Sequence, residues 1–270
     1  MKIAIQEDML PGGTMTEKFE TAKALGLDGV EVWGRDLATK IYAIAEASQQ
    51  TGVPVSSVNH GRQGRLLDPH PAERARALAE LRASITGAVD LKADCVVLVP
   101  MFYGPLLPDL GPWLSPFELE SELFYTHLRT LSDFCEALDN LLCIEPINRY
   151  ETSFLNRVEQ AAAIAQRLDH PRVKVTADVY HMALEEADLP AALRDHAQWI
   201  GHVHLADNNR RLPGQGLLNF APIAEALAAS GYDGWLVLEC GAPSANQPHA
   251  AAYRRDLPAS LAYLKEAGLR

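Results

Sequence analysis

Residues 141–147 read Leu-Leu-Cys-Ile-Glu-Pro-Ile, a short apolar run with a single acid near its end. Such a run, bounded by turn residues, is typical of a buried β-strand. Seven further β-rich runs recur along the chain, and each is followed by a polar turn and a helical pattern rich in Ala, Leu and Glu. The eight predicted strands are residues 2–6, 29–33, 53–59, 95–100, 141–147, 173–178, 200–206 and 235–240.

Alternating strands and helices predict a parallel sheet covered by helices, because the crossover between two parallel strands is long enough to hold a helix. Eight such units favour an α/β fold of the (β/α)₈ TIM-barrel type, and 270 residues is close to the usual length of that barrel. An open doubly wound sheet is the rival, but no GxGxxG follows the first predicted strand. Since no linker or low-complexity tract divides the chain, we expect one domain over residues 1–270.

The composition is that of an ordinary protein of the aqueous phase, with 48% hydrophobic and 22% charged residues. No apolar run approaches the roughly 20 residues of a membrane span, and no signal-peptide pattern is present, so we expect a cytoplasmic protein without a membrane partner. The net charge of −11 repels phosphate backbones and argues against a nucleic-acid partner. The cysteines lack CxxC spacing, which predicts reduced core thiols.

Ionisable residues stand at the ends of four successive predicted strands: Glu145, Asp178, His204 and Glu239. The carboxyl ends of barrel strands meet at one face, so these four groups are expected to converge there. A shared dication would offset the cost of burying them. Three carboxylates and an imidazole favour Mn²⁺, with Mg²⁺ or Co²⁺ as alternatives. His202 lies on the same strand face as His204, so spacing alone leaves either histidine as the ligand.

Four more polar residues fall in loops at the same end of the predicted barrel. Glu151 follows Glu145 in the chain, while His181 and Arg210 follow Asp178 and His204, and His60 comes after the third predicted strand. Each also has an ordinary structural interpretation when taken alone. Glu151 could be a solvated acid and His181 a helix-terminus contact, while Arg210 could be a surface charge and His60 could hydrogen-bond a loop. We interpret His60 as a substrate contact.

Two further features border the same end of the predicted barrel. Glu31 and Trp33 end the second predicted strand and form either a packing pair or a pocket wall. The longest loop, residues 101–116, is rich in Gly, Pro and aromatic residues and is expected to cover the substrate entrance.

Several short motifs then occur in a fixed order along the chain. They are Glu145-Pro-Ile-Asn-Arg-Tyr-Glu151-Thr, Asp178-Val-Tyr-His181-Met, Gly201-His-Val-His204 with Asn209-Arg210, and Pro213-Gly-Gln-Gly216. With these motifs the chain resembles the xylose-isomerase-like sugar isomerase/epimerase superfamily. Within it, the chain is most similar to the D-tagatose/D-psicose 3-epimerases. The resemblance covers the whole predicted barrel and is most specific from Glu145 to Glu239.

The resemblance implies C3 epimerisation of a free ketose through a cis-enediolate, on a divalent cation held by Glu145, Asp178, His204 and Glu239. It selects His204 rather than His202 as the ligand. Glu145 and Glu239 would act as the catalytic acid and base on opposite sides of C3. Glu151, His181 and Arg210 would hold the oxygens at C1 to C3. The resemblance also implies a small sugar substrate and a homo-oligomer, either a dimer or a tetramer.

Other functions remain alternatives at this point. Hydroxypyruvate isomerases share the first two motifs, and inosose isomerases or dehydratases of the same superfamily retain a histidine at the position of His204. An apurinic-site endonuclease is a remote alternative, because Asp178 and His181 resemble its metal motif but further histidines are missing. A non-catalytic sugar-binding module would not need two glutamates placed for proton transfer. Gln6 and Glu7 depart from the aromatic residue typical of the ketose epimerases, which leaves the sugar itself undecided.

Overall fold

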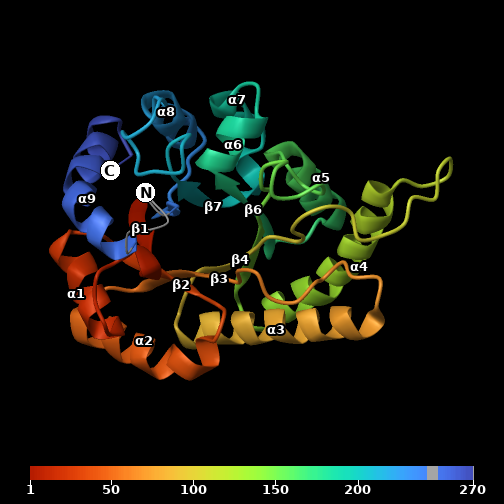
Figure 1. Cartoon of the computed structure of the whole chain (residues 1–270), viewed down its shortest axis with the longest axis horizontal. Coiled ribbons are helices and arrows are strands. Elements are labelled where there is room, and N and C mark those ends of the chain that lie inside the picture. Colours follow the sequence, from red (N-terminus) through yellow and green to blue (C-terminus); the bar gives the residue numbers. More distant parts are fainter. Residues whose placement is uncertain (242–248, 270) are drawn as a thin grey trace.

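The computed structural model describes residues 1–241 and 249–269, and its centre is a closed barrel of parallel strands (Figure 1). Each strand pairs with the next, and the last pairs with the first. The strands are β1 Lys2–Gln6, β2 Gly29–Trp33, β3 Val55–Asn59, β4 Cys95–Leu98, β5 Leu141–Ile144, β6 Val173–Asp178, β7 Ile200–Leu205 and β8 Trp235–Leu238. The predicted (β/α)₈ TIM barrel is therefore confirmed.

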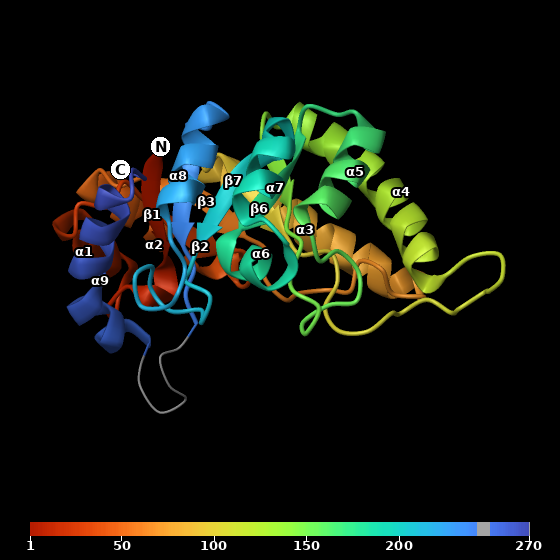
Figure 2. The same ribbon diagram turned by 90° about the horizontal axis from the view of Figure 1, so that it is seen from above.

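Helices surround the barrel and cover its outer surface, as the two views show together (Figures 1 and 2). They are α1 Met15–Ala24, α2 Leu37–Thr51, α3 Pro71–Asp90, α4 Pro116–Ala137, α5 Val158–Leu168, α6 Val179–Glu185, α7 Leu189–Asp195, α8 Ala221–Ala229 and α9 His249–Glu266. Two short 3₁₀ helices are η1 Glu7–Met9 and η2 Ala197–Trp199. The main hydrophobic core lies between these helices and the strands. No helix in residues 1–241 and 249–269 combines the length and apolar character of a membrane crossing.

β3, β4, β5, β7 and β8 are shorter than the sequence predicts, and prolines interrupt the sheet at the first three of them. β3 starts after Pro54, and β4 and β5 end before Pro100 and Pro146. Proline has no N–H to donate to a neighbouring strand, so the ladder stops beside it. Glu145 lies directly after β5, yet its N–H still donates to the carbonyl of Leu98 at 2.8 Å. The end of the strand therefore still fixes the backbone from which the Glu145 side chain projects.

The interior of the barrel is filled in two different ways. Its lower part holds small apolar clusters, one of Ala4, Trp235 and Val237 and one of Cys95, Val97 and Cys143. Towards the carboxyl ends of the strands the buried side chains become polar and charged. All four cysteines are buried and form no disulfide, as the sequence predicts. The apolar floor supports a polar layer that faces the loops at the carboxyl ends of the strands.

The loop between β4 and α4 borders the carboxyl end of the barrel only over its first residues. Tyr103 exchanges backbone hydrogen bonds with the loop after β5, through the Glu151 carbonyl at 2.6 Å and the Ser153 N–H at 2.9 Å. The rest of the loop extends beyond α4, away from the barrel (Figures 1 and 2). The expected cover of the entrance is thus limited to the start of this loop.

The loop after β7 is organised by one buried carboxylate, Asp207. Its two oxygens accept hydrogen bonds from four backbone N–H groups at 2.9 to 3.1 Å, those of Asn208, Gly214, Gly216 and Leu218. A Cβ atom on Gly216 would lie 2.1 Å from Asp207 Oδ1, so only glycine fits there. The Pro213-Gly-Gln-Gly216 motif is therefore bound to a buried carboxylate, and Arg210 precedes it in the same loop.

We expect Asp207→Asn to lower the free energy of unfolding by about 2 kcal/mol, because an amide nitrogen would face N–H groups that now have an acceptor. Urea denaturation followed by circular dichroism measures this change. Asp133→Asn, on the exposed face of α4, is the matched control and should leave the free energy of unfolding near that of the parent. Equal unfolding free energies for Asp207→Asn and the parent would contradict this account of the loop.

Candidate active site and metal centre

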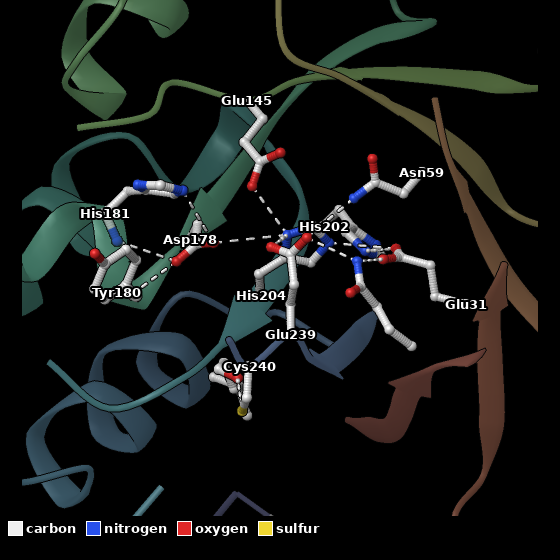
Figure 3. Close-up of polar contacts among 12 residues, drawn as sticks. Glu31, Asn59, Glu145, Asp178, Tyr180, His181, His202, His204, Glu239 and Cys240 are labelled. Atoms are coloured by element: carbon white, nitrogen blue, oxygen red, sulfur yellow. Dashed lines mark hydrogen bonds and ion pairs between the residues drawn. The ribbon is translucent and has the colours of Figure 1, made fainter. Parts of the chain in front are cut away.

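Four side chains meet at the carboxyl end of the barrel, one from the end of each of β5, β6, β7 and β8. Glu145, Asp178, His204 and Glu239 are all buried, and one ligand atom from each lies within 4.8 Å of the others (Figure 3). His204 Nδ1 is 3.0 Å from Glu145 Oε1, 3.0 Å from Glu239 Oε2 and 3.8 Å from Asp178 Oδ2. The structure thus brings together the four residues that the sequence predicts as metal ligands.

The three carboxylates of this cluster repel one another, and all of them are buried. Burial raises the pKa of Glu145 to about 7 and that of Asp178 to about 7, and Glu239 adds to both shifts. Burial also raises the pKa of Glu239, but the nearby His204 outweighs it and the resulting value is about 2. Burial lowers the pKa of His204, whereas Glu239 and Glu31 raise it well above its ordinary value. The site therefore needs a positive charge at its centre.

The ligand set fits a divalent cation. Three carboxylates and one imidazole nitrogen are the donors that a hard or borderline dication accepts, and no thiol takes part. His204 directs Nδ1 at the carboxylates, while its Nε2 lies 3.3 Å from Glu31 Oε2. A metal-bound histidine usually donates its other N–H to a carboxylate in this way. The acids and the imidazole would then share the dication instead of repelling one another.

Glu31 is a part of the site that the sequence analysis did not assign. Its Oε2 accepts a hydrogen bond from Ser57 Oγ at 2.6 Å and lies 3.1 Å from His202 Nε2. Although burial raises the pKa of Glu31, the two histidines hold it well below its ordinary value. The signal was present, because one acid within the apolar run Gly-Val-Glu-Val-Trp needs a buried partner. The sequence left Glu31 as either a packing partner or a pocket wall, and neither interpretation anticipated its contact with His204.

The register of the strands separates the two histidines of β7. His204 lies opposite Asp178 of β6, whereas His202 lies opposite Thr176, one layer deeper in the barrel. His202 contacts Glu31 and Cys95, whose Sγ is 3.5 Å from the His202 Nδ1 atom. The four-residue cluster includes His204 and not His202, in line with the choice that the resemblance made.

Two amide side chains hold Glu239 from outside the cluster. Gln6 Nε2 donates to Glu239 Oε1 at 2.7 Å, and Asn59 Nδ2 donates to the same oxygen at 3.2 Å. The other oxygen, Oε2, faces His204. Gln6 also donates to Glu31 Oε1 at 3.0 Å, so one amide joins the two carboxylates. These contacts assign a role to Gln6, which the sequence analysis marked only as a departure from the aromatic residue of the ketose epimerases.

A cavity of about 230 Å³ opens above the cluster. Its lining contains both glutamates of the cluster, Glu145 and Glu239, together with the predicted substrate contacts Glu151, His181 and Arg210. Arg210 Nη1 donates to Glu151 Oε1 at 2.9 Å. Burial lowers the pKa of Arg210, but Glu239 and Asp178 raise it further, so the guanidinium stays charged. The cavity therefore combines acids, a fixed cation and an imidazole.

His181 and His60 lie in different surroundings. The backbone N–H and side-chain amide of Asn148 donate to His181 Nδ1 at 3.1 and 2.8 Å, which leaves the His181 Nε2–H as a donor. His60 does not line this cavity. Its Nδ1 contacts Ser84 and Gln63, and the residue lines a second, neighbouring cavity.

Comparison with known proteins agrees with this fold. The sequence profile of the family described as Xylose isomerase-like TIM barrel matches residues 19–266, and the chain belongs to that family. The chain is 33% identical over 259 residues to 3-dehydro-D-guloside 4-epimerase of Escherichia coli K12, a match that covers 95% of this chain and 98% of the relative. It is 31% identical over 232 residues to D-psicose 3-epimerase of Ruminiclostridium cellulolyticum, which covers 82% of this chain and 76% of the relative.

Solved structures give the same result. The apo crystal structure of 3-keto-D-glucoside 4-epimerase from Escherichia coli superposes with a TM-score of 0.86 at 30% identity and covers 98% of this chain and 99% of that one. D-psicose 3-epimerase of Clostridium cellulolyticum with D-tagatose gives a TM-score of 0.85 and covers 99% of each chain, but at 22% identity it supports the fold alone. The chain is thus an enzyme, a sugar epimerase or isomerase of this superfamily.

We expect Glu31→Gln to weaken the binding of Mn²⁺ about 10- to 100-fold, because the carboxylate that orients His204 would be lost. Isothermal titration calorimetry of the metal-free protein with Mn²⁺ measures this affinity. Glu46→Gln, on the exposed face of α2, is the matched control and should bind Mn²⁺ like the parent. An unchanged affinity in Glu31→Gln would contradict the positioning role of this carboxylate.

Proposed function

We propose that this enzyme inverts a hydroxyl-bearing sugar carbon that lies next to a ketone, with one divalent cation, preferably Mn²⁺, in the site. The observation that carries the proposal is the position of Glu145 and Glu239. They line one cavity, come from β5 and β8, and approach His204 Nδ1 from different sides at 3.0 Å each (Figure 3). A reacting carbon between them would have a carboxyl group on each face.

The proton transfers follow from this arrangement. One glutamate removes the proton from the carbon next to the ketone, which leaves a cis-enediolate, and the other returns a proton on the opposite face. Return on the opposite face inverts the centre. A dication held by Glu145, Asp178, His204 and Glu239 would stabilise the negative charge that develops on the substrate oxygens. Gln6 and Asn59 hold Glu239 at one oxygen and so keep its other oxygen directed at the cluster.

Three residues would orient the sugar. Arg210 offers a charged donor, and Glu151, which it binds, offers an acceptor at the side of the cavity. The His181 Nε2–H offers a second donor close to Asp178, at 3.8 Å from its Oδ2. These donors and acceptors suit adjacent sugar hydroxyls. A site built to hydrogen-bond a hydroxyl strongly rejects analogues that lack it. His60 remains a proposed substrate contact through the neighbouring cavity.

Two classes of substrate fit this removal of a proton from the carbon next to a ketone. The sequence resemblance favours a free ketose that is epimerised at C3. The relative that this chain matches over 95% of its length is named for C4 epimerisation of a 3-dehydro-hexoside, where C4 also lies next to a ketone. Isomerisation is an alternative reaction, because the chain is also similar to a putative hydroxypyruvate isomerase. The two are 27% identical over 83% of this chain and 85% of the relative. We further propose a cytoplasmic dimer or tetramer without a nucleic-acid partner.

We expect Glu145→Gln and Glu239→Gln each to reduce exchange of the proton next to the ketone by about 10²-fold or more, because an amide cannot serve as the acid or base. Proton NMR of ketoses and 3-dehydro-hexosides incubated in D₂O measures the exchange and also its position on the sugar. Circular dichroism checks that both variants are folded. Glu225→Gln, on the exposed face of α8, is the control. Normal deuterium incorporation in either site variant would refute the acid/base assignment.

Removal of the metal gives a separate test. We expect chelation with EDTA followed by dialysis to abolish activity, since the buried carboxylates would then lack the charge that holds them together. Addition of Mn²⁺ or Co²⁺ should restore activity. Full turnover by protein that contains no metal by atomic absorption would disprove the metal-dependent reaction.

A further inference from the structure

A second cavity of about 240 Å³ adjoins the cavity of the active site. It lies between the loop after β3 and the loop after β4, over α3. The two cavities have four lining residues in common: Gly61, Arg62, Val99 and Phe102. They therefore meet along a common wall, which consists largely of the side chains of Arg62 and Phe102.

The second cavity differs from the first in chemistry. Eight ionisable residues line the active-site cavity. The second is lined mainly by apolar side chains, among them Leu66, Leu67, Leu81, Met101, Phe102 and Leu106. Sugar hydroxyls placed against this wall would lose their hydrogen bonds to water without replacement. The cavity therefore suits an apolar group, and a volume of about 150 Å³ is enough for benzene in a protein interior.

The lining of this cavity also contains a few polar side chains, namely Arg62, Gln63, Arg65, Tyr103 and His60. Gln63 Nε2 donates to His60 Nδ1 at 3.1 Å, so the proton of the neutral ring lies on Nε2. Burial lowers the pKa of His60 to about 4, which keeps the ring neutral. The Nε2 atom has no hydrogen-bond partner among the residues that the structure describes. His60 Nε2–H is thus a donor in a mainly apolar cavity, and a few polar groups in such a lining are the pattern of a small-molecule subsite.

The common wall is suited to passage between the cavities. Arg62 is held by Glu151 Oε2 at 3.0 Å and by the Tyr103 hydroxyl at 3.2 Å, and its guanidinium lies 4.4 Å from the centre of the Phe102 ring. Its side chain is 55% exposed, so it can turn towards solvent without a large loss of packing. Gly61 beside it has no side chain to obstruct the wall.

From these observations we infer that the second cavity is a subsite for the aglycone of a glycoside, so that the substrate is a 3-dehydro-hexoside with an apolar group on C1. This inference rests on the proposed function. In a pyranoside ring C1 lies opposite C4, so a sugar with C4 between Glu145 and Glu239 directs its C1 substituent away from them. A free ketose has no apolar substituent to place in this cavity. Two similar proteins carry a glycoside in their names, a guloside in one and a glucoside in the other.

The test compares phenyl and methyl 3-dehydro-D-glucoside, each as the α- and the β-anomer, with the full-length Mn²⁺-loaded enzyme. Deuterium exchange at C4, followed by NMR, gives kcat/KM, and isothermal titration calorimetry gives the dissociation constant. We expect kcat/KM for the phenyl glycoside to exceed that for the methyl glycoside about tenfold, because part of an aromatic ring becomes buried. Leu106→Asn should reduce this ratio to near one. Leu110→Asn, on the same loop but outside the lining of both cavities, is the matched control and should retain the ratio.

The outcomes separate the subsite from the reaction. Equal constants for the two glycosides with normal exchange at C4, or a ratio that Leu106→Asn leaves unchanged, would overturn the subsite and leave the reaction intact. Exchange at C3 of free ketoses with no binding of either glycoside would also overturn it. Tighter binding of the phenyl glycoside without exchange in any sugar would support the subsite and refute the proposed reaction.

Discussion

The repulsion among three buried carboxylates is the constraint on which the rest of this active site depends. Glu145, Asp178 and Glu239 are buried, and each brings a ligand atom to within 4.8 Å of the others. Like charges at this separation in a weakly polarisable medium oppose folding unless a cation lies among them. His204 supplies part of that positive charge, and a divalent cation would supply it more fully. The closed sheet keeps the acids together, because their backbones are bound to neighbouring strands.

The groups around this centre form a support that extends through the barrel. Gln6 joins Glu239 to Glu31, and Glu31 in turn binds His204, His202 and Ser57. A side chain that is held at both ends cannot change rotamer freely, so the orientation of each acid is fixed before a substrate arrives. The apolar floor of the barrel closes this polar layer from below. The chemistry is therefore placed on rigid strands, whereas the sugar contacts are carried by loops.

The sequence was enough to predict the barrel and the four groups at its carboxyl end, because both follow from spacing along single strands. It did not predict what depends on pairing between distant strands. The contact of Glu31 with His204 joins β2 to β7, and the link from Gln6 to Glu239 joins β1 to β8. His60 was placed at the correct end, but its position behind the common wall depends on how two loops pack. Pro100 and Pro146 stand in the sequence, yet the predicted strands extend to or beyond them, whereas β4 and β5 end before them.

The most direct measurement of the central claim is a crystal structure of the Mn²⁺-loaded protein with anomalous diffraction at the manganese edge. Our account predicts one strong anomalous peak among Glu145, Asp178, His204 and Glu239, with His204 Nδ1 as the nitrogen ligand. A peak among Glu31, His202 and His204 instead, which is the other group of potential ligands in the described part of the chain, would contradict it. The absence of any peak at full Mn²⁺ loading would contradict it equally.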